Sequence, residues 1–240
     1  DVAIALLPVL AFGVYQFGLR ALMVIAICIV TCVLSELIFE LLAKKTVTIF
    51  DYSAVVTGMI LAVNLPANVA WWIPVIGSVF AIVAVKMLFG GLGQNFMNPA
   101  LAARCFLLIS FTGRMSDFAT SGTLTEQFEM IKTGGIKALT SAADATAGAT
   151  PLAVLKGGEE VDLLTLFLGF HGGCIGEVSA LAILIGGLYL IVKKVISVRI
   201  PLTYILSTAL FIFVINIASG NDVSLNYMLG QVLSGGLLVG

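Results

Sequence analysis

The sequence predicts an all-helical fold, a polytopic transmembrane helix bundle, and its composition carries most of this prediction. Hydrophobic residues make up 60% of the chain and charged residues only 10%, with a mean hydropathy of +1.14. Soluble domains carry roughly 25% charged residues, so this chain has too few charges to cover a surface that faces water. The apolar residues also come in runs of helical length, and helices are one of the two structures that can cross a bilayer.

The apolar runs define the expected spans, several of which are short or interrupted by glycine and proline. They are residues 1–17, 19–43, 52–66, 71–89, 99–112, 178–192, 201–218 and 223–240. Residues 161–177 are apolar but broken by glycines, so we expect an interfacial or half-membrane helix there and not a crossing. A resemblance between residues 58–68 and 209–221 suggests a two-repeat architecture with broken helices, and chance similarity between glycine-containing helices is the alternative.

Basic residues in two short loops predict the sidedness of the chain. With the spans above, Lys44 and Lys45 fall on the same side as Lys193, Lys194 and Arg199. The positive-inside rule makes that side cytoplasmic, so the long polar stretch 113–162 is predicted to be external. We expect a single transmembrane domain over residues 1–240, a fragment that lacks both ends because it begins without methionine and stops inside an apolar run.

Charge and cysteine spacing argue against two classes of partner. The chain has 12 basic and 13 acidic residues and no basic cluster interleaved with aromatic residues, which argues against a nucleic-acid partner. Its four cysteines form no C-x-x-C pair and have no second histidine to join His171. A zinc or iron–sulfur site held within this chain is therefore not expected.

The stretch KMLFGGLGQNFMNPALAARCFL, residues 86–107, is the first candidate site. Glycines let the backbone approach a ligand, and Asn95 and Asn98 offer both hydrogen-bond donors and acceptors. Non-helical backbone at membrane depth requires protein or a lined cavity to satisfy its polar groups, so we expect Asn95, Asn98 and Arg104 to line a polar site. The alternative is a tight turn between two helices, with Lys86 and Arg104 reaching the interface.

The second candidate is DATAGATPLAVLK, residues 144–156, in the stretch predicted to be external. Thr150 suits a helix N-cap and Pro151 suits the first helical position, so the segment can simply begin a short helix. The small residues before Thr150 also leave the backbone open to a modifying enzyme.

Four motifs, in order along nearly the whole chain, resemble the flavin-anchoring membrane subunit of bacterial Rnf and Na⁺-NQR complexes, the RnfD/NqrB family. They are DYSAVVTGMILAVNLP at 51–66, FGGLGQNFMNPALAARCFL at 89–107, GATPL at 148–152 and GGCIGEVSALAILIGGLYL at 172–190. The resemblance implies that Thr150 carries FMN through a phosphoester bond, made by a flavin transferase, with Asp144, Gly148 and Ala149 completing the attachment motif. Ala147 departs from this motif, in which serine or threonine is common.

RnfD is the favoured member, because the external loops are compact, and the resemblance then implies an ion-translocating ferredoxin:NAD⁺ oxidoreductase of the bacterial cytoplasmic (inner) membrane. In this reading the chain transfers electrons among other membrane and peripheral subunits, which hold the ferredoxin and NAD sites, and couples electron flow to Na⁺ or H⁺ export. A second, non-covalent riboflavin or FMN is implied near this subunit. Asn95, Phe96, Asn98 and Arg104 are the residues expected to contribute to cofactor binding.

Ionisable residues inside apolar spans are functional candidates by default, which makes Lys86 and Glu177 candidates for an ion pathway. Mutual pairing or snorkelling of their side chains is the alternative. Glu36, Glu40 and Asp51 are expected at the cytoplasmic interface and are less informative. His171, beside a glycine pair, could relay protons or bind flavin, or it could bond a backbone carbonyl.

Two other functions fit parts of this pattern. An NqrB-type subunit of a Na⁺-translocating NADH:quinone reductase shares the motifs. A solute channel or transporter without a cofactor also uses broken helices and paired halves. A flavin on Thr150 separates the redox subunits from the transporter.

Overall fold

The computed structural model describes residues 1–44, 46–116, 118, 163–169, 171–177, 179–218 and 229–231. In these ranges every regular element is a helix, as the composition predicts, and no strand is present. Two described helices are long and apolar enough to cross a membrane, Leu19–Leu42 and Arg199–Ile217. The other apolar helices are shorter, at 10–17 residues.

The helices follow the apolar runs of the sequence closely. They are α1 (Val2–Phe17), α2 (Leu19–Leu42), α3 (Ser53–Val63), α4 (Trp72–Val79) continued by η2 (Phe80–Met87), α5 (Pro99–Ser110), α11 (Ala180–Val192) and α12 (Arg199–Ala218). Short elements complete the set: η1 (Ile49–Asp51), α6 (Thr112–Met115) and α10 (Leu163–Leu168). The glycine-broken stretch 161–177 thus holds only a six-residue helix within its described part, and most of the expected span 223–240 lies outside the described residues.

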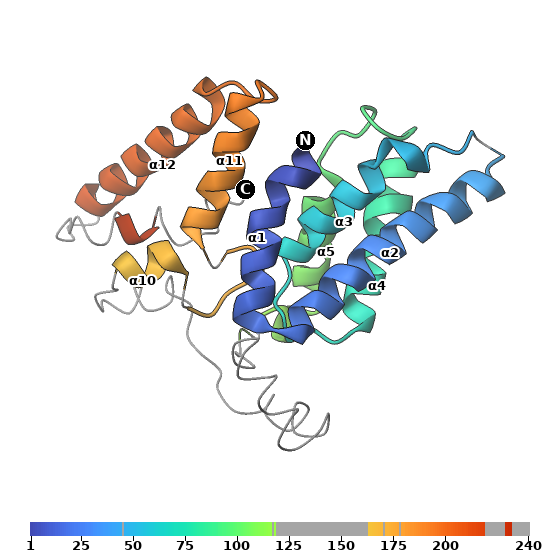
Figure 1. Ribbon diagram of the computed structural model, residues 1–240, viewed down its shortest axis with the longest axis horizontal. Helices are drawn as coiled ribbons and strands as arrows, with labels where there is room; N and C mark the ends of the chain where they lie inside the picture. Colours follow the sequence, from blue (N-terminus) through green and yellow to red (C-terminus); the bar gives the residue numbers. More distant parts are fainter. Residues whose placement is uncertain are drawn as a thin grey trace, which may run out of the picture. The chain divides into compact units, whose positions relative to one another are not determined.

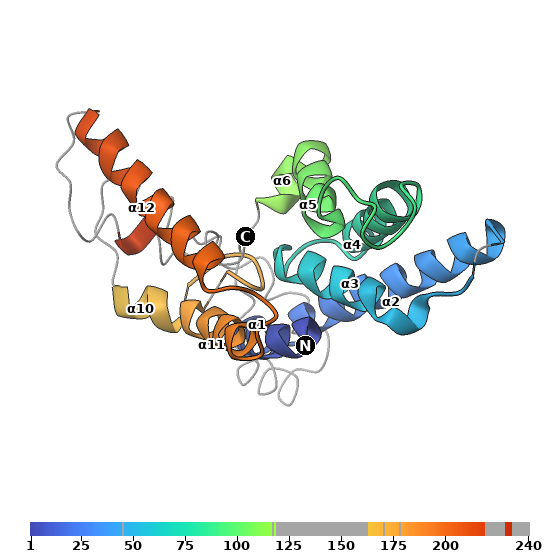
Figure 2. The ribbon, with the colours of Figure 1, turned by 90° about the horizontal axis from the view of Figure 1, so that it is seen from above.

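The chain divides into two compact units, residues 13–147 and residues 1–12 with 148–240. In the first unit, α2 packs along α3 and α4, and α5 packs against α3, α4 and η2 (Figures 1 and 2). A Cβ added at Gly58 of α3 would lie 2.8 Å from the Cα of Ile29 on α2. Only glycine therefore permits this approach of the two helices.

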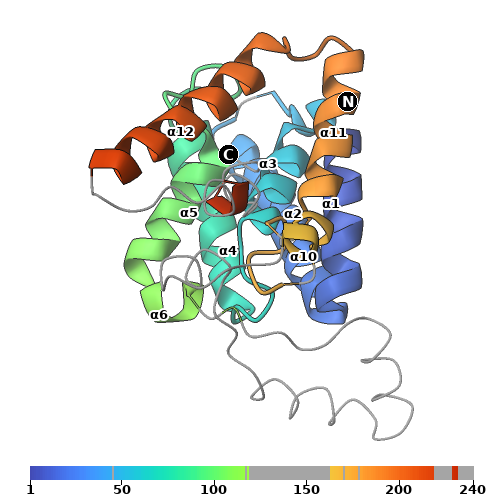
Figure 3. The same cartoon turned by 90° about the vertical axis from the view of Figure 1, so that its left-hand side faces the viewer.

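In the second unit, the start of α1 lies beside α11 (Figure 3). The two backbones approach so closely that a Cβ added at Gly186 of α11 would collide with the carbonyl oxygen of Ala5. By contrast, almost all large apolar side chains of α12 are exposed. Such a surface in water would be unusual, and lipid or another protein is the environment that it suits.

The segment η2 is wound as a π-helix that continues α4 without a break. At its end the amide of Leu88 donates to the carbonyl of Val83, five residues earlier, at 3.1 Å. The chain then turns away through Gly90 and Gly91, whose φ angles of 116° and 104° are accessible mainly to glycine. Single π-turns inside helices occur frequently at functional sites, and the next described site begins on this segment.

Candidate functional site

Lys86 lies on η2 and is buried, with 2% of its surface exposed. Its Nζ lies 2.8 Å from each carboxylate oxygen of Glu36 on α2, fifty residues earlier in the chain. Nζ also donates to the hydroxyl of Ser53, at the start of α3, at 2.6 Å. One lysine thus joins three helices through hydrogen bonds that avoid water.

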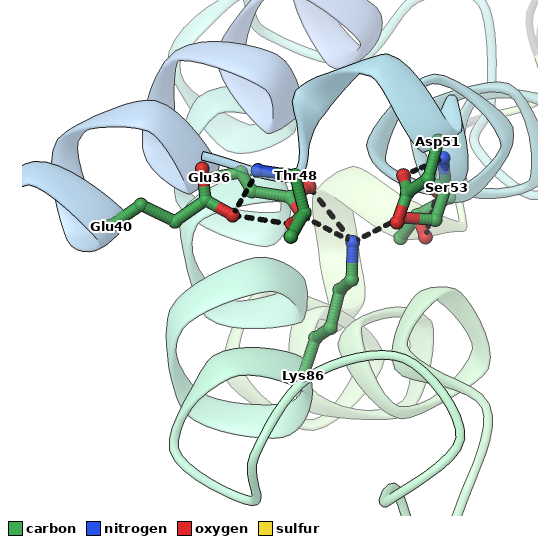
Figure 4. Close-up of polar contacts among 7 residues, drawn as sticks. Glu36, Glu40, Thr48, Asp51, Ser53 and Lys86 are labelled. Atoms are coloured by element: carbon green, nitrogen blue, oxygen red, sulfur yellow. Dashed lines mark hydrogen bonds and ion pairs between the residues drawn. The ribbon is translucent and has the colours of Figure 1, made fainter. Parts of the chain in front are cut away.

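The contacts around Lys86 extend to the protein surface on two sides (Figure 4). Ser53 donates from its backbone and its hydroxyl to Asp51 Oδ1, at 2.8 and 2.6 Å. The hydroxyl of Thr48 lies 3.5 Å from Glu36 Oε1. Thr48 and Asp51 are exposed, whereas Glu36 is 1% exposed. We call these residues the Lys86 network, with one further member described next.

Glu40, one turn after Glu36 on α2, is the sixth member, and it is also 1% exposed. Its Oε1 accepts hydrogen bonds from the amide of Thr48, at 3.0 Å, and from the Thr48 hydroxyl. Its Oε2 is buried and has no hydrogen-bond partner among the residues that the structure describes. The network therefore places two buried carboxylates beside one buried ammonium group.

The glycine-rich loop between η2 and α5 gives structural roles to both candidate asparagines. Asn98 is exposed and caps α5, its Oδ1 accepting from the amide of Ala100 at 3.0 Å. Asn95, with its amide nitrogen turned inward, lies 3.2 Å from the carbonyl oxygens of Val85, Lys86 and Gly91 and so satisfies the end of η2. Both side chains serve the backbone, as the expected turn requires, and Asn98 does so at the surface.

Phe96 is the apolar candidate in this loop, and it is exposed. Its ring packs edge to face with the exposed ring of Phe89, with 5.0 Å between the centroids. The two rings form an aromatic surface on an otherwise glycine-rich turn. This surface could stack on a planar ligand.

Arg104 on α5 donates to Asn64 Oδ1 at 2.6 Å. Asn64 is buried at the end of α3, and its own amide donates to the carbonyl of Ile60 at 2.8 Å. Arg20, at the start of α2, makes a similar contact with Asn68 Oδ1 at 3.2 Å. Two arginines from different helices thus hold the turn that follows α3.

Glu177 lies in the other unit, after α10. Its Oε2 accepts from the amide of Cys174 at 3.3 Å, and the Nδ1 of the nearby His171 lies 3.1 Å from the carbonyl of Gly172. Asp144, Gly148, Ala149 and Thr150, the expected attachment motif, lie outside the described residues.

Sequence reasoning identified Lys86 but missed its partners. Glu36 and Glu40 were expected at the interface because they stand near the end of an apolar run, yet both are almost fully buried. A signal was present in the sequence. The two glutamates are four residues apart, which places them on one face of a helix whose other faces are apolar.

The described part of the chain defines a class: apolar helices that bury a lysine–carboxylate network between them. The chain belongs to the NQR2, RnfD, RnfE family, whose sequence pattern matches residues 1–240. The resemblance drawn from the four motifs is thereby confirmed.

Three relatives illustrate the similarity, and each is the D-type component of its complex. The chain is 50% identical over 240 residues to that of the Na(+)-translocating ferredoxin:NAD(+) oxidoreductase complex of Acetobacterium woodii, covering 98% of this chain and 68% of the relative. It is 34% identical over 251 residues to that of the proton-translocating ferredoxin:NAD(+) oxidoreductase complex of Clostridium ljungdahlii, covering 100% of this chain and 70% of the relative. It is 37% identical over 227 residues to that of the ion-translocating oxidoreductase complex of Stutzerimonas stutzeri, covering 86% and 63%.

Proposed function

We propose that this chain is the RnfD component of an ion-translocating ferredoxin:NAD⁺ oxidoreductase, the Rnf complex. The 50% identity to the Acetobacterium woodii protein carries the proposal, because it extends over nearly the whole chain. All three relatives are D-type components by name, which favours an RnfD role over an NqrB role. Its partners are then the other subunits of the complex, which supply the ferredoxin and NAD sites.

In this function the chain is a multi-pass protein of the bacterial cytoplasmic membrane, with residues 113–162 outside. The exposed apolar surface of α12 supports an environment of lipid or of neighbouring subunits. The buried Lys86 network supports it too, because a charge inside a membrane protein is stabilised by pairing with an opposite charge inside the bundle.

Thr150 is the proposed carrier of FMN, attached by a flavin transferase through a phosphoester bond. Asp144, Gly148 and Ala149 belong to the sequence that the transferase reads. Thr150 precedes Pro151 and so suits the N-cap of a helix. Amide hydrogens and partial positive charge at a helix N-terminus would stabilise the anionic phosphodiester.

A second, non-covalent flavin is proposed at the loop that holds Asn95, Phe96 and Asn98, with Arg104 below it on α5. The exposed rings of Phe89 and Phe96 support this proposal, since they offer an aromatic surface to an isoalloxazine ring. When bound, a flavin accepts one or two electrons and passes them on singly. The loop's part is to position the ring, and Asn95 and Asn98 keep the loop in shape.

Lys86 and Glu177 remain the proposed members of an ion pathway. Lys86 has the stronger support, because it is buried and paired with Glu36. The relatives include one named as Na⁺-translocating and one named as proton-translocating, so the exported ion is Na⁺ or H⁺. A transporter without a cofactor is the contrasting function.

Ultraviolet fluorescence after denaturing electrophoresis tests the proposal, with the chain made alongside a matching flavin transferase. We expect a fluorescent band that Thr150→Ala abolishes. Thr146→Ala, a matched change four residues earlier, should keep the band, and Asp144→Ala should weaken it. No fluorescence in the unsubstituted chain would favour the cofactor-free transporter, and a band that survives Thr150→Ala would move the attachment to another residue.

A further inference from the structure

The hydrogen bonds of Lys86 leave none of its charge for Glu40. An ammonium group has three N–H donors, and the two oxygens of Glu36 and the hydroxyl of Ser53 lie within 2.8 Å of Nζ. The nearest further carboxylate, Asp51, is exposed and bonds to Ser53. Lys86 thus neutralises Glu36 alone.

Glu40 is satisfied on one oxygen only. Oε1 receives both donors that Thr48 can offer, its amide and its hydroxyl. Oε2 has no partner in the described ranges, and the side chain is 1% exposed. A buried carboxylate without a balancing charge is costly, because water no longer solvates it.

We propose that Oε2 of Glu40 binds a monovalent cation, a proton or Na⁺, that neutralises this second buried carboxylate. A proton taken from water would form one O–H bond and convert the carboxylate into a neutral acid. Na⁺ would bind to the oxygen without any bond being broken. Both ions supply one positive charge, which is the charge that the pair of glutamates and Lys86 lack.

The position of the site gives the cation a route to water. Thr48 is exposed and bonds directly to Glu40, while its hydroxyl also lies 3.5 Å from Glu36 Oε1 (Figure 4). A cation on Glu40 therefore lies one residue from the surface and one residue from the Lys86–Glu36 pair. The binding site rests on this geometry alone, whereas a part for it in ion export rests on the proposed function.

Carbodiimide labelling tests the site in the assembled complex in membrane vesicles. Dicyclohexylcarbodiimide is apolar and reacts with protonated carboxyl groups, and peptide mass spectrometry locates the product. We expect a label on Glu40 that increases as the pH is lowered. If NaCl suppresses the label and equal choline chloride does not, Na⁺ binds there; if neither salt has an effect, the cation is a proton. Absence of label on Glu40 at every pH would overturn the proposal.

A pair of matched variants tests the same idea without the reagent. Glu40→Gln replaces a neutralised carboxyl by a neutral amide, so we expect the midpoint of thermal unfolding to stay the same or increase. Glu36→Gln leaves Lys86 without its counter-charge, so we expect the midpoint to fall. A fall in Glu40→Gln as large as in Glu36→Gln would overturn the proposal, because it would show that Glu40 is needed as an anion. Ion export by the complex is a separate measurement, and its loss or survival in Glu40→Gln tests only the role in transport.

Discussion

Lys86 and Glu36 are fifty residues apart in sequence, yet the ammonium group of one lies 2.8 Å from both carboxylate oxygens of the other. Both side chains are at most 2% exposed. Removing one member of such a buried pair leaves an uncompensated charge, which costs about 3–5 kcal/mol, whereas replacing both by apolar residues is often neutral.

This pair gives the first prediction. Lys86→Met should lower the free energy of unfolding by about 3–5 kcal/mol, measured by thermal or denaturant unfolding of the purified protein in detergent. The double variant Glu36→Leu/Lys86→Met should recover most of that loss. A double variant as unstable as the sum of the two single variants would contradict the pairing.

The second prediction concerns the approach of α2 and α3. Gly58→Ala should destabilise the protein by about 1–3 kcal/mol, because the new methyl group would lie against the backbone of Ile29 and the helices would have to separate. Gly187→Ala on α11 is the matched control. No atom lies within 4 Å of a Cβ at that position, so it should have little effect or stabilise the helix by about 0.5–1 kcal/mol. Equal effects of the two changes on the unfolding midpoint would argue against the close contact.

The third prediction separates the structural role of Asn98 from a role in flavin binding. Asn98→Ala removes a helix cap and should cost about 1 kcal/mol of stability, while Asn98→Ser should keep most of it. If Asn98 only caps α5, non-covalent flavin in the purified complex should remain the same in Asn98→Ser. Loss of that flavin in a stable Asn98→Ser variant would assign the side chain a direct contact.

The fourth prediction is the sidedness of the chain. On a cysteine-free background, a membrane-impermeant thiol reagent applied to intact cells should label Ser141→Cys and miss Lys45→Cys. The expected result follows from the basic residues in the two short loops. The reverse labelling pattern would overturn the topology, and with it an electron path that crosses the membrane to a flavin outside.

Much of the helical structure could be predicted from the sequence, because apolar runs fix where helices form. The predicted runs 1–17 and 19–43, for example, correspond to α1 and α2 within one residue at each end. Asn98 and Pro99 likewise stand at the cap and first turn of α5, as their local preferences require.

The partners of Lys86 could not be predicted in the same way. A single sequence shows that Glu36 and Glu40 share a helix face, but not which distant segment covers that face. The covering segment is η2, and its π-helical winding leaves no mark in the pattern of apolar residues. The polar turn after Gly90 had two interpretations for a similar reason, since an asparagine that binds a ligand and one that satisfies the backbone have the same local sequence.

The winding of η2 also makes the place of Lys86 a matter of helical phase. A π-helix needs more residues for each turn than an α-helix, so every position after Phe80 is rotated relative to the α-helical continuation of α4. Rewinding this segment as an α-helix would turn the lysine side chain around the helix axis, away from Glu36, while Trp72–Val79 stayed in place. One-residue insertions and deletions within 80–87 are therefore expected to separate the charges, even where every residue of the pair is kept.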